Sequence, residues 1–199
     1  MNLTSEFLER RNVVGIILFA IACSLLFATF GKVESAVQRP GRTIENKIPA
    51  HVPLQTKFKK DKEEKIKSNK EWYRDFEMDI TNTGDKPIYY FALFIQMPDV
   101  TSANGATMVF NVFFGRAELV DANVRPEPDD KPLMPKETYT FTIPLKNQIS
   151  WEAWQKKNNK YEVPKLVILF NHLSFGDGTG FMSLDAIPFP IKQEPEGHE

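Results

Sequence analysis

The apolar residues of this chain first gather in one long run near the N-terminus. Residues 12–31 read NVVGIILFAIACSLLFATFG, and the 18 residues from Val13 to Phe30 carry no charge. In a helix that rises about 1.5 Å per residue they span roughly 27 Å, close to the thickness of a bilayer's hydrocarbon core. The pattern therefore predicts a single N-terminal transmembrane helix.

Three roles compete for this run: a retained signal anchor, a cleaved signal peptide, and a lipoprotein signal that ends at Cys23. A cleaved signal peptide has a shorter apolar core followed by small residues, whereas this run ends in Phe30 and Gly31. A lipidated Cys23 would begin a polar tether, but residues 24–27 read SLLF. We therefore expect a signal anchor that stays in the chain.

The charges beside the run predict its orientation. Arg10 and Arg11 precede it directly, and Lys32 follows it closely. Because Lys and Arg are enriched on the cytoplasmic side of membrane spans, we expect residues 1–11 in the cytoplasm. The remainder of the chain is then expected outside the cytoplasm, in a periplasmic or extracellular position.

After the run, short apolar stretches alternate with prolines and turn residues. Residues 32–50 are polar and predict a tether, residues 51–191 predict one β domain, and residues 192–199 predict a disordered polar tail. Near the start of the domain, residues 57–70 carry seven lysines among three acids. They predict a solvated loop, with contact to anionic lipid headgroups as the alternative.

Alternation of apolar and polar residues marks the expected strands. Residues 72–80 alternate and predict a half-buried strand, whereas residues 88–97 are almost continuously apolar and predict a strand covered on both faces. We expect these two strands to pair as a hairpin, with Pro98 ending the second. Further strands are expected at 51–58, 108–114, 138–144, 166–175 and 181–189.

A short helix is expected at residues 150–157, with Ser150 as its N-cap. Together the elements predict a mainly β fold, an antiparallel β-sandwich of immunoglobulin-like or fibronectin-like type with one short helix. A lipocalin-like barrel is the alternative, but the expected strands are too few and too unevenly spaced for it.

Composition narrows the range of functions. A formal net charge of −1 gives no reason to expect nucleic acid as a partner. The single cysteine lies in the apolar run, so the β domain has no disulfide and no cysteine ligand for zinc.

Two groups of residues are candidates for binding. Trp151 and Trp154 lie three residues apart on one helical face, where they would either stack on sugar rings or pack in the core. Asp129 and Asp130 belong to an acidic, proline-broken stretch, residues 118–130. Its carboxylates would either pair as the acid and base of a weak glycan hydrolase or form an exposed loop.

The glycine-rich loop 176–180 is a third candidate. Its glycines allow backbone conformations with positive φ, and Asp177, with help from Asp185, could offer oxygen ligands to calcium. A tight connection between strands is the alternative role, because glycine and aspartate are common turn residues. No other cofactor is indicated.

Three segments resemble an uncharacterised family of bacterial membrane-anchored proteins with one extracytoplasmic β-sandwich domain. They are GDKPIYYF at 84–91, EPDDKPLMPKETYTFTIP at 127–144 and FGDGTGFM at 175–182. The resemblance implies a bacterial cytoplasmic membrane protein and no particular activity. In many sandwich domains the turn before an inner strand reads P-G-E-T, and here Lys136 replaces the glycine.

The sequence thus predicts a single-pass membrane protein, anchored by residues 12–31, whose outer domain is not an enzyme. We expect that domain to bind an envelope protein or polymer, or to have a structural role in the envelope. The alternative is a carbohydrate-binding module or weak glycan hydrolase that uses Trp151, Trp154 and the acidic loop.

Overall fold

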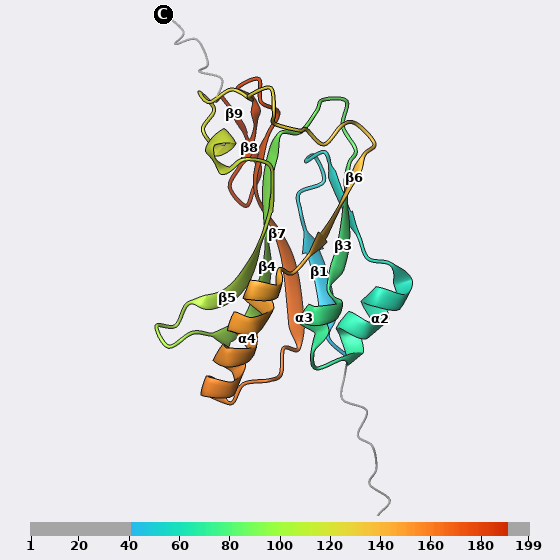
Figure 1. Ribbon diagram of the computed structural model, residues 1–199, viewed down its shortest axis with the longest axis vertical. Helices are drawn as coiled ribbons and strands as arrows, with labels where there is room; N and C mark the ends of the chain where they lie inside the picture. The colour runs from blue at the N-terminus through green and yellow to red at the C-terminus, as the bar shows by residue number, and fades with distance from the viewer. Residues whose placement is uncertain (1–40, 191–199) are drawn as a thin grey trace, which may run out of the picture. The chain divides into compact units, whose positions relative to one another are not determined.

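Two β-sheets with a shared hydrophobic core form the fold (Figure 1). The computed structural model describes residues 41–190. The larger sheet has six strands in the order β5-β4-β7-β8-β9, with β1 paired to β7, and the smaller sheet has the order β2-β3-β6. The expected mainly β class, with antiparallel sheets and few helices, is confirmed.

The elements have the following bounds. The strands are β1 (Thr43–Lys47), β2 (Leu54–Lys57), β3 (Glu77–Asn82), β4 (Tyr90–Thr101), β5 (Thr107–Phe114), β6 (Thr138–Thr142), β7 (Lys165–Ser174), β8 (Gly180–Met182) and β9 (Ile187–Phe189). The helices are α2 (Lys60–Ser68), α3 (Trp72–Asp75), the 3-10 helix η1 (Ala117–Val120) and α4 (Leu145–Asn158).

The core lies between the two sheets because alternate residues of their strands point inward. Met78 and Ile80 of β3 and Phe141 of β6 are buried together with Ile95 of β4 and Ile168 of β7. The alternation predicted for residues 138–144 is confirmed, since Phe141 is buried and the flanking threonines are exposed.

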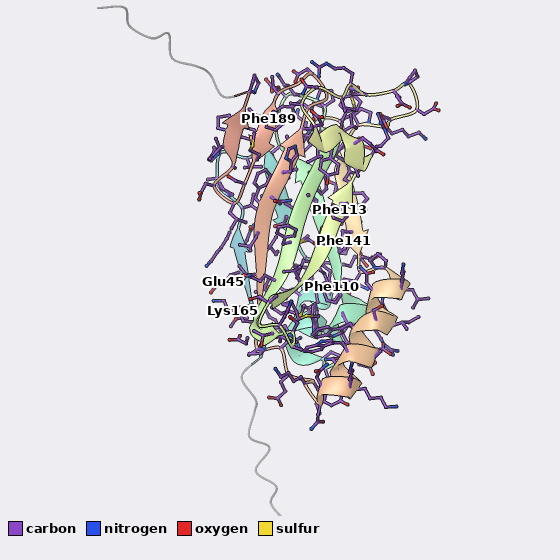
Figure 2. The ribbon with its side chains drawn as sticks, turned by 90° about the vertical axis from the view of Figure 1, so that its left-hand side faces the viewer. Glu45, Phe110, Phe113, Phe141, Lys165 and Phe189 are labelled. Atoms are coloured by element: carbon purple, nitrogen blue, oxygen red, sulfur yellow. The ribbon has the colours of Figure 1, made fainter. Side chains whose placement is uncertain are left out.

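Strand β7 is the centre of the larger sheet and is paired along both edges. One edge pairs with β4 in the antiparallel sense. On the other edge, β1 pairs in parallel from Thr43↔Lys165 to Lys47↔Leu169, and β8 pairs with the last three residues. Figure 2 shows Glu45 of β1 beside Lys165 of β7, and their side chains form an ion pair of 2.7 Å.

Strand β1 lies in the stretch 32–50 that the sequence predicts as a tether, so the folded domain begins before residue 51. Arg42, directly before β1, fixes the start of this strand and is 8% exposed. The Arg42 guanidinium donates to the carbonyl oxygens of Val163 and Ile66 and stacks on the ring of Trp72 at 5.0 Å. Burial lowers the pKa of Arg42 to about 10, because the guanidinium loses part of its hydration.

Four local predictions are wrong. Strands β3 and β4 belong to different sheets and form no hairpin. Residues 72–75 are helical, and the lysine-rich run 57–70 contains helix α2 in place of a loop. Helix α4 begins at Leu145, so Ser150 is no N-cap; its hydroxyl donates to the carbonyl oxygen of Lys146 inside the helix.

Two further points concern strand ends. The prediction that Pro98 ends the strand is wrong, because β4 continues through Pro98 to Thr101, with irregular pairing to β5 after Met97. Lys136 adopts φ 70° before β6, so it occupies the left-handed conformation that glycine has in the P-G-E-T turn.

The predicted membrane span 12–31, its flank 1–11 and the tail 192–199 lie outside the described residues. Within residues 41–190, none of the helices is both long enough and apolar enough to cross a membrane.

Candidate functional site

An open cleft of about 810 Å³ lies at the end of the sandwich where β4 finishes. Its walls come from the residues around α3, the end of β4, the second half of α4 and the segment after it. They are Lys70, Glu71, Tyr73, Asp99, Val100, Glu152, Gln155, Asn159, Lys160, Tyr161 and Glu162. We call this feature the α3–α4 cleft.

The wall after α4 is shaped by the end of that helix. Asn159 adopts φ 51°, a left-handed conformation that ends the helix and turns the chain back. The backbone N–H of Lys160 then donates to the carbonyl oxygen of Gln155 at 3.1 Å. Gln155 is 4% exposed, and its side-chain amide reaches the carbonyl oxygen of Tyr161 at 3.5 Å. The turn thereby fixes Lys160 and Tyr161 on the rim of the cleft.

A single arginine joins the two helical walls. Arg74 of α3 binds Glu152 of α4 through Nη2 at 2.7 Å and Nε at 3.0 Å, and it lies 3.4 Å from Glu71. The hydrogen bond that Arg74 donates to Glu152 raises the pKa of Arg74, so this cation keeps its charge. Burial, together with the nearby Glu152, raises the pKa of Tyr73, so its hydroxyl stays protonated as a donor.

Three further charged residues of the cleft, one acid and two lysines, take no part in these ion pairs. Lys70, Asp99 and Lys160 are exposed and form no salt bridge with the described residues. The phenol of Tyr161 is 47% exposed beside them. The cleft therefore presents cations, carboxylates, amides and phenols, which are groups that bind a polar or charged ligand by hydrogen bonds and charge.

The structure places the two candidate tryptophans against each other. Trp151 is 3% exposed, and its ring meets Phe110 of β5 at 5.7 Å between centroids. Trp154 is partly buried and stacks on Trp151 at 5.1 Å with an interplanar angle of 10°. One face of Trp154 is thus covered by Trp151, which corresponds to the core-packing alternative for the pair.

Asp129 and Asp130 belong to the connection between β5 and β6. Figure 1 shows this connection at the opposite end of the strands from α4. Arg116 holds Asp130 through Nη2 at 2.9 Å, and the backbone N–H of Glu127 donates to the same carboxylate at 2.8 Å. These hydrogen bonds lower the pKa of Asp130. Asp129 is exposed. The acidic loop and the tryptophan pair therefore form no common site.

Asp177 is engaged by its own chain. Lys86 donates to Oδ2 at 2.9 Å, and the backbone N–H of Thr179 donates to Oδ1 at 2.9 Å. Partial burial opposes ionisation, but these hydrogen bonds outweigh it and hold the pKa of Asp177 at about 2. Asp185 lies in the turn at the other end of β8 and is exposed. Within residues 41–190 no three His, Cys, Asp or Glu side chains are grouped so that they could hold a metal ion.

The glycines of loop 176–180 are explained by packing. A Cβ on Gly176, which has φ 74°, would lie 2.5 Å from Pro126, and one on Gly180 would lie 2.0 Å from the carbonyl oxygen of Leu173. The loop therefore packs against the β5–β6 connection and forms a tight turn between β7 and β8.

Sequence reasoning missed the α3–α4 cleft, because its walls come from segments that are distant in the chain. Comparison of the chain with protein-family models, with curated proteins and with solved structures finds no match. The family resemblance proposed from the sequence thus stays a prediction, and a function is inferred from the geometry of the described residues.

Proposed function

We propose that the protein is a single-pass membrane protein whose extracytoplasmic β-sandwich is a non-enzymatic binding module, with the α3–α4 cleft as its ligand site. The observation that carries the proposal is the cleft itself, about 810 Å³ in volume and lined by charged, amide and phenol groups. This volume lies within the range of about 300–1,000 Å³ that is usual for ligand sites.

The strand order supports an immunoglobulin-like or fibronectin-like type of sandwich. Strands β2, β3 and β6 would be A, B and E, and strands β5, β4, β7 and β8 would be C′, C, F and G. Modules of this architecture commonly bind their partners at one end of the sandwich, with residues from the connections between strands. The α3–α4 cleft has this position, because it is built from the connections β2–β3 and β6–β7 and from the end of β4.

The entry point of the chain supports an anchored arrangement. Arg42 contacts Val163 and Ile66, beside the segment that forms the rim of the cleft. Ten residues, 32–41, separate this point from the end of the predicted span. Fully extended, ten residues reach about 35 Å. An anchor at 12–31 would therefore keep the cleft near the outer surface of the membrane, where an envelope protein or polymer is within reach.

A photocrosslinking experiment in native membranes tests this function. A photoreactive phenylalanine analogue replaces Tyr161 in the full chain, and the matched control carries it at Asp85, an exposed residue in the β3–β4 turn. We expect an adduct from position 161 that is lost when Asp99→Lys and Lys160→Glu reverse the charges of the cleft. Equal adducts from both positions, or an adduct that survives the charge reversal, would contradict the proposal.

A further inference from the structure

Helix α4 exposes apolar side chains on the surface that faces away from the core. Leu145 is 69% exposed and Ile149 is 58% exposed, and they are the two most exposed large hydrophobic residues within the described part of the chain. They lie four residues apart, so they occupy one face of the helix, and exposed Ala153 continues the line by another turn. We call this surface the outer face of α4.

The buried side of the same helix accounts for its other apolar residues. Trp151 contacts Phe110 of β5, and Gln155 is buried against the chain that follows the helix. At about 100° per residue, Leu145, Ile149 and Ala153 lie at least a third of a turn from Trp151. Core packing therefore explains Trp151 and leaves the outer face unexplained.

The charges around the outer face are positive. Lys146, Lys156 and Lys157 are exposed and form no ion pair with other residues of the 41–190 range. Glu152 is the one carboxylate in the sequence of α4, and Arg74 pairs with it. The helix thus combines an exposed apolar line with cations that form no ion pair among the described residues, and both kinds of group can gain free energy at the headgroups of an anionic membrane.

The path of the chain places this helix within reach of a membrane. The backbone N–H of Thr43 donates to the carbonyl oxygen of Pro164, six residues after the end of α4. Figure 1 shows β1 beginning at the same end of the fold as α4. Residues 32–41 span at most about 35 Å, and the 14 residues of α4 are about 21 Å long, so the whole helix could touch the bilayer that holds the predicted anchor.

We propose that the outer face of α4 docks on the outer surface of the anchoring bilayer. Leu145 and Ile149 insert among the lipid headgroups, while Lys146, Lys156 and Lys157 bind the phosphates of anionic lipids. The inference rests on the anchored part of the proposed function. It adds a second contact with the membrane, which sets the orientation of the domain and holds the α3–α4 cleft close to the lipid surface.

Full-length protein in lipid nanodiscs tests the docking. In a Cys23→Ala background, an environment-sensitive fluorophore is attached at Ala153→Cys, and a matched control carries it at Asp85→Cys in the β3–β4 turn. The nanodiscs contain zwitterionic lipid alone or with 30 mol% phosphatidylglycerol, and a lipid with a nitroxide near its headgroup acts as quencher.

We expect strong quenching at position 153 in anionic nanodiscs and little at position 85. Each Lys→Gln substitution at 146, 156 or 157 lowers the docked-to-undocked ratio about fivefold, the equivalent of about 1 kcal/mol per cation. Added salt weakens the docking by screening the lysines. Leu145→Ala with Ile149→Ala removes the quenching without lowering the melting temperature, because both side chains are exposed and alanine favours the helix.

Three results would overturn the inference. Equal quenching at positions 153 and 85 means that α4 does not meet the lipid. A blue shift at position 153 that depends on protein concentration, without quenching by the nitroxide lipid, means that a second copy covers the face. A chain that fails to enter nanodiscs at all removes the anchor, and with it both the proposed function and the docking.

Discussion

Replacement of Trp151 by alanine separates the two roles that the sequence allows for the tryptophan pair. Trp151 is 3% exposed and lies between Phe110 and Trp154. A tryptophan that buries about 200 Å² contributes roughly 5 kcal/mol at about 25 cal/mol per Å², and alanine keeps about 1 kcal/mol of this. We therefore expect Trp151→Ala to lower the free energy of unfolding by about 4 kcal/mol, within the range for buried tryptophans.

Urea unfolding of residues 41–199, followed by far-ultraviolet circular dichroism, measures this loss without relying on tryptophan fluorescence. Trp154→Ala is the matched control. Because Trp154 is only partly buried, we expect it to cost about half as much. If Trp151→Ala costs less than about 1 kcal/mol while binding to soluble glycans disappears, the core role is refuted and the sugar-binding alternative is favoured.

Three further predictions follow from buried or paired charges. His172 is 8% exposed between the rings of Tyr90 and Phe189, and burial lowers its pKa. The contribution of neutral His172 to stability is therefore complete above the unfolded pKa of about 6.5 and declines as the pH falls below that value. The urea midpoint should fall between pH 7.5 and pH 5, and His172→Phe should make this fall smaller. A fall of the same size in His172→Phe would contradict the prediction. Arg42→Met removes the hydrogen bonds to Val163 and Ile66 and should cost about 2 kcal/mol; hydrogen exchange in β1 should accelerate, and unchanged protection there would show that Arg42 does not hold the strand. Lys86→Ala removes a hydrogen bond to Asp177 and should raise the pKa of that carboxyl, measured by NMR titration; a constant pKa would mean that Thr179 alone stabilises the carboxylate.

Apolar periodicity predicts the strands of this fold well where one face is buried and the other is wet. Phe141 and the threonines of β6 follow the expected alternation, and the apolar run 88–97 corresponds to most of β4. The same signal fails at residues 72–75. Trp72 and Phe76 lie four residues apart, a spacing that puts them on one face in a strand and in a helix alike, so periodicity could not separate the two.

The pairing of the strands could not be predicted from local pattern. Strands β3 and β4 are neighbours in sequence, yet the connection between them passes from one sheet to the other. Strand β1 reads TIENK, and its polar composition resembles a tether. It becomes a strand because β8 pairs only with the end of β7 and leaves the first half of that edge free to pair with β1. The hydrogen bonds of Arg42 also hold the start of β1 in place.

The candidate sites show the same limit. The glycines of loop 176–180 are evident in the sequence. The reason that glycine is needed there is close contact with Pro126 and Leu173, which only the fold brings near the loop. Conversely, Asp99, Lys160 and Tyr161 carry no motif, and the end of β4 and the turn after α4 bring them together in the cleft.

The labelling of two cysteines tests the central claim, that an outward-facing domain holds a ligand in the α3–α4 cleft. In a Cys23→Ala background, Tyr161→Cys lies on the rim of the cleft and Asp85→Cys lies in the distant β3–β4 turn. A membrane-impermeant maleimide is added to intact cells and, separately, to detergent-solubilised chain. We expect Asp85→Cys to react equally fast in both, and Tyr161→Cys to react at least about tenfold more slowly in cells, as the site of a bound ligand would. Labelling of both cysteines only after lysis would contradict the orientation, and equal rates for Tyr161→Cys in cells and in detergent would contradict the ligand site.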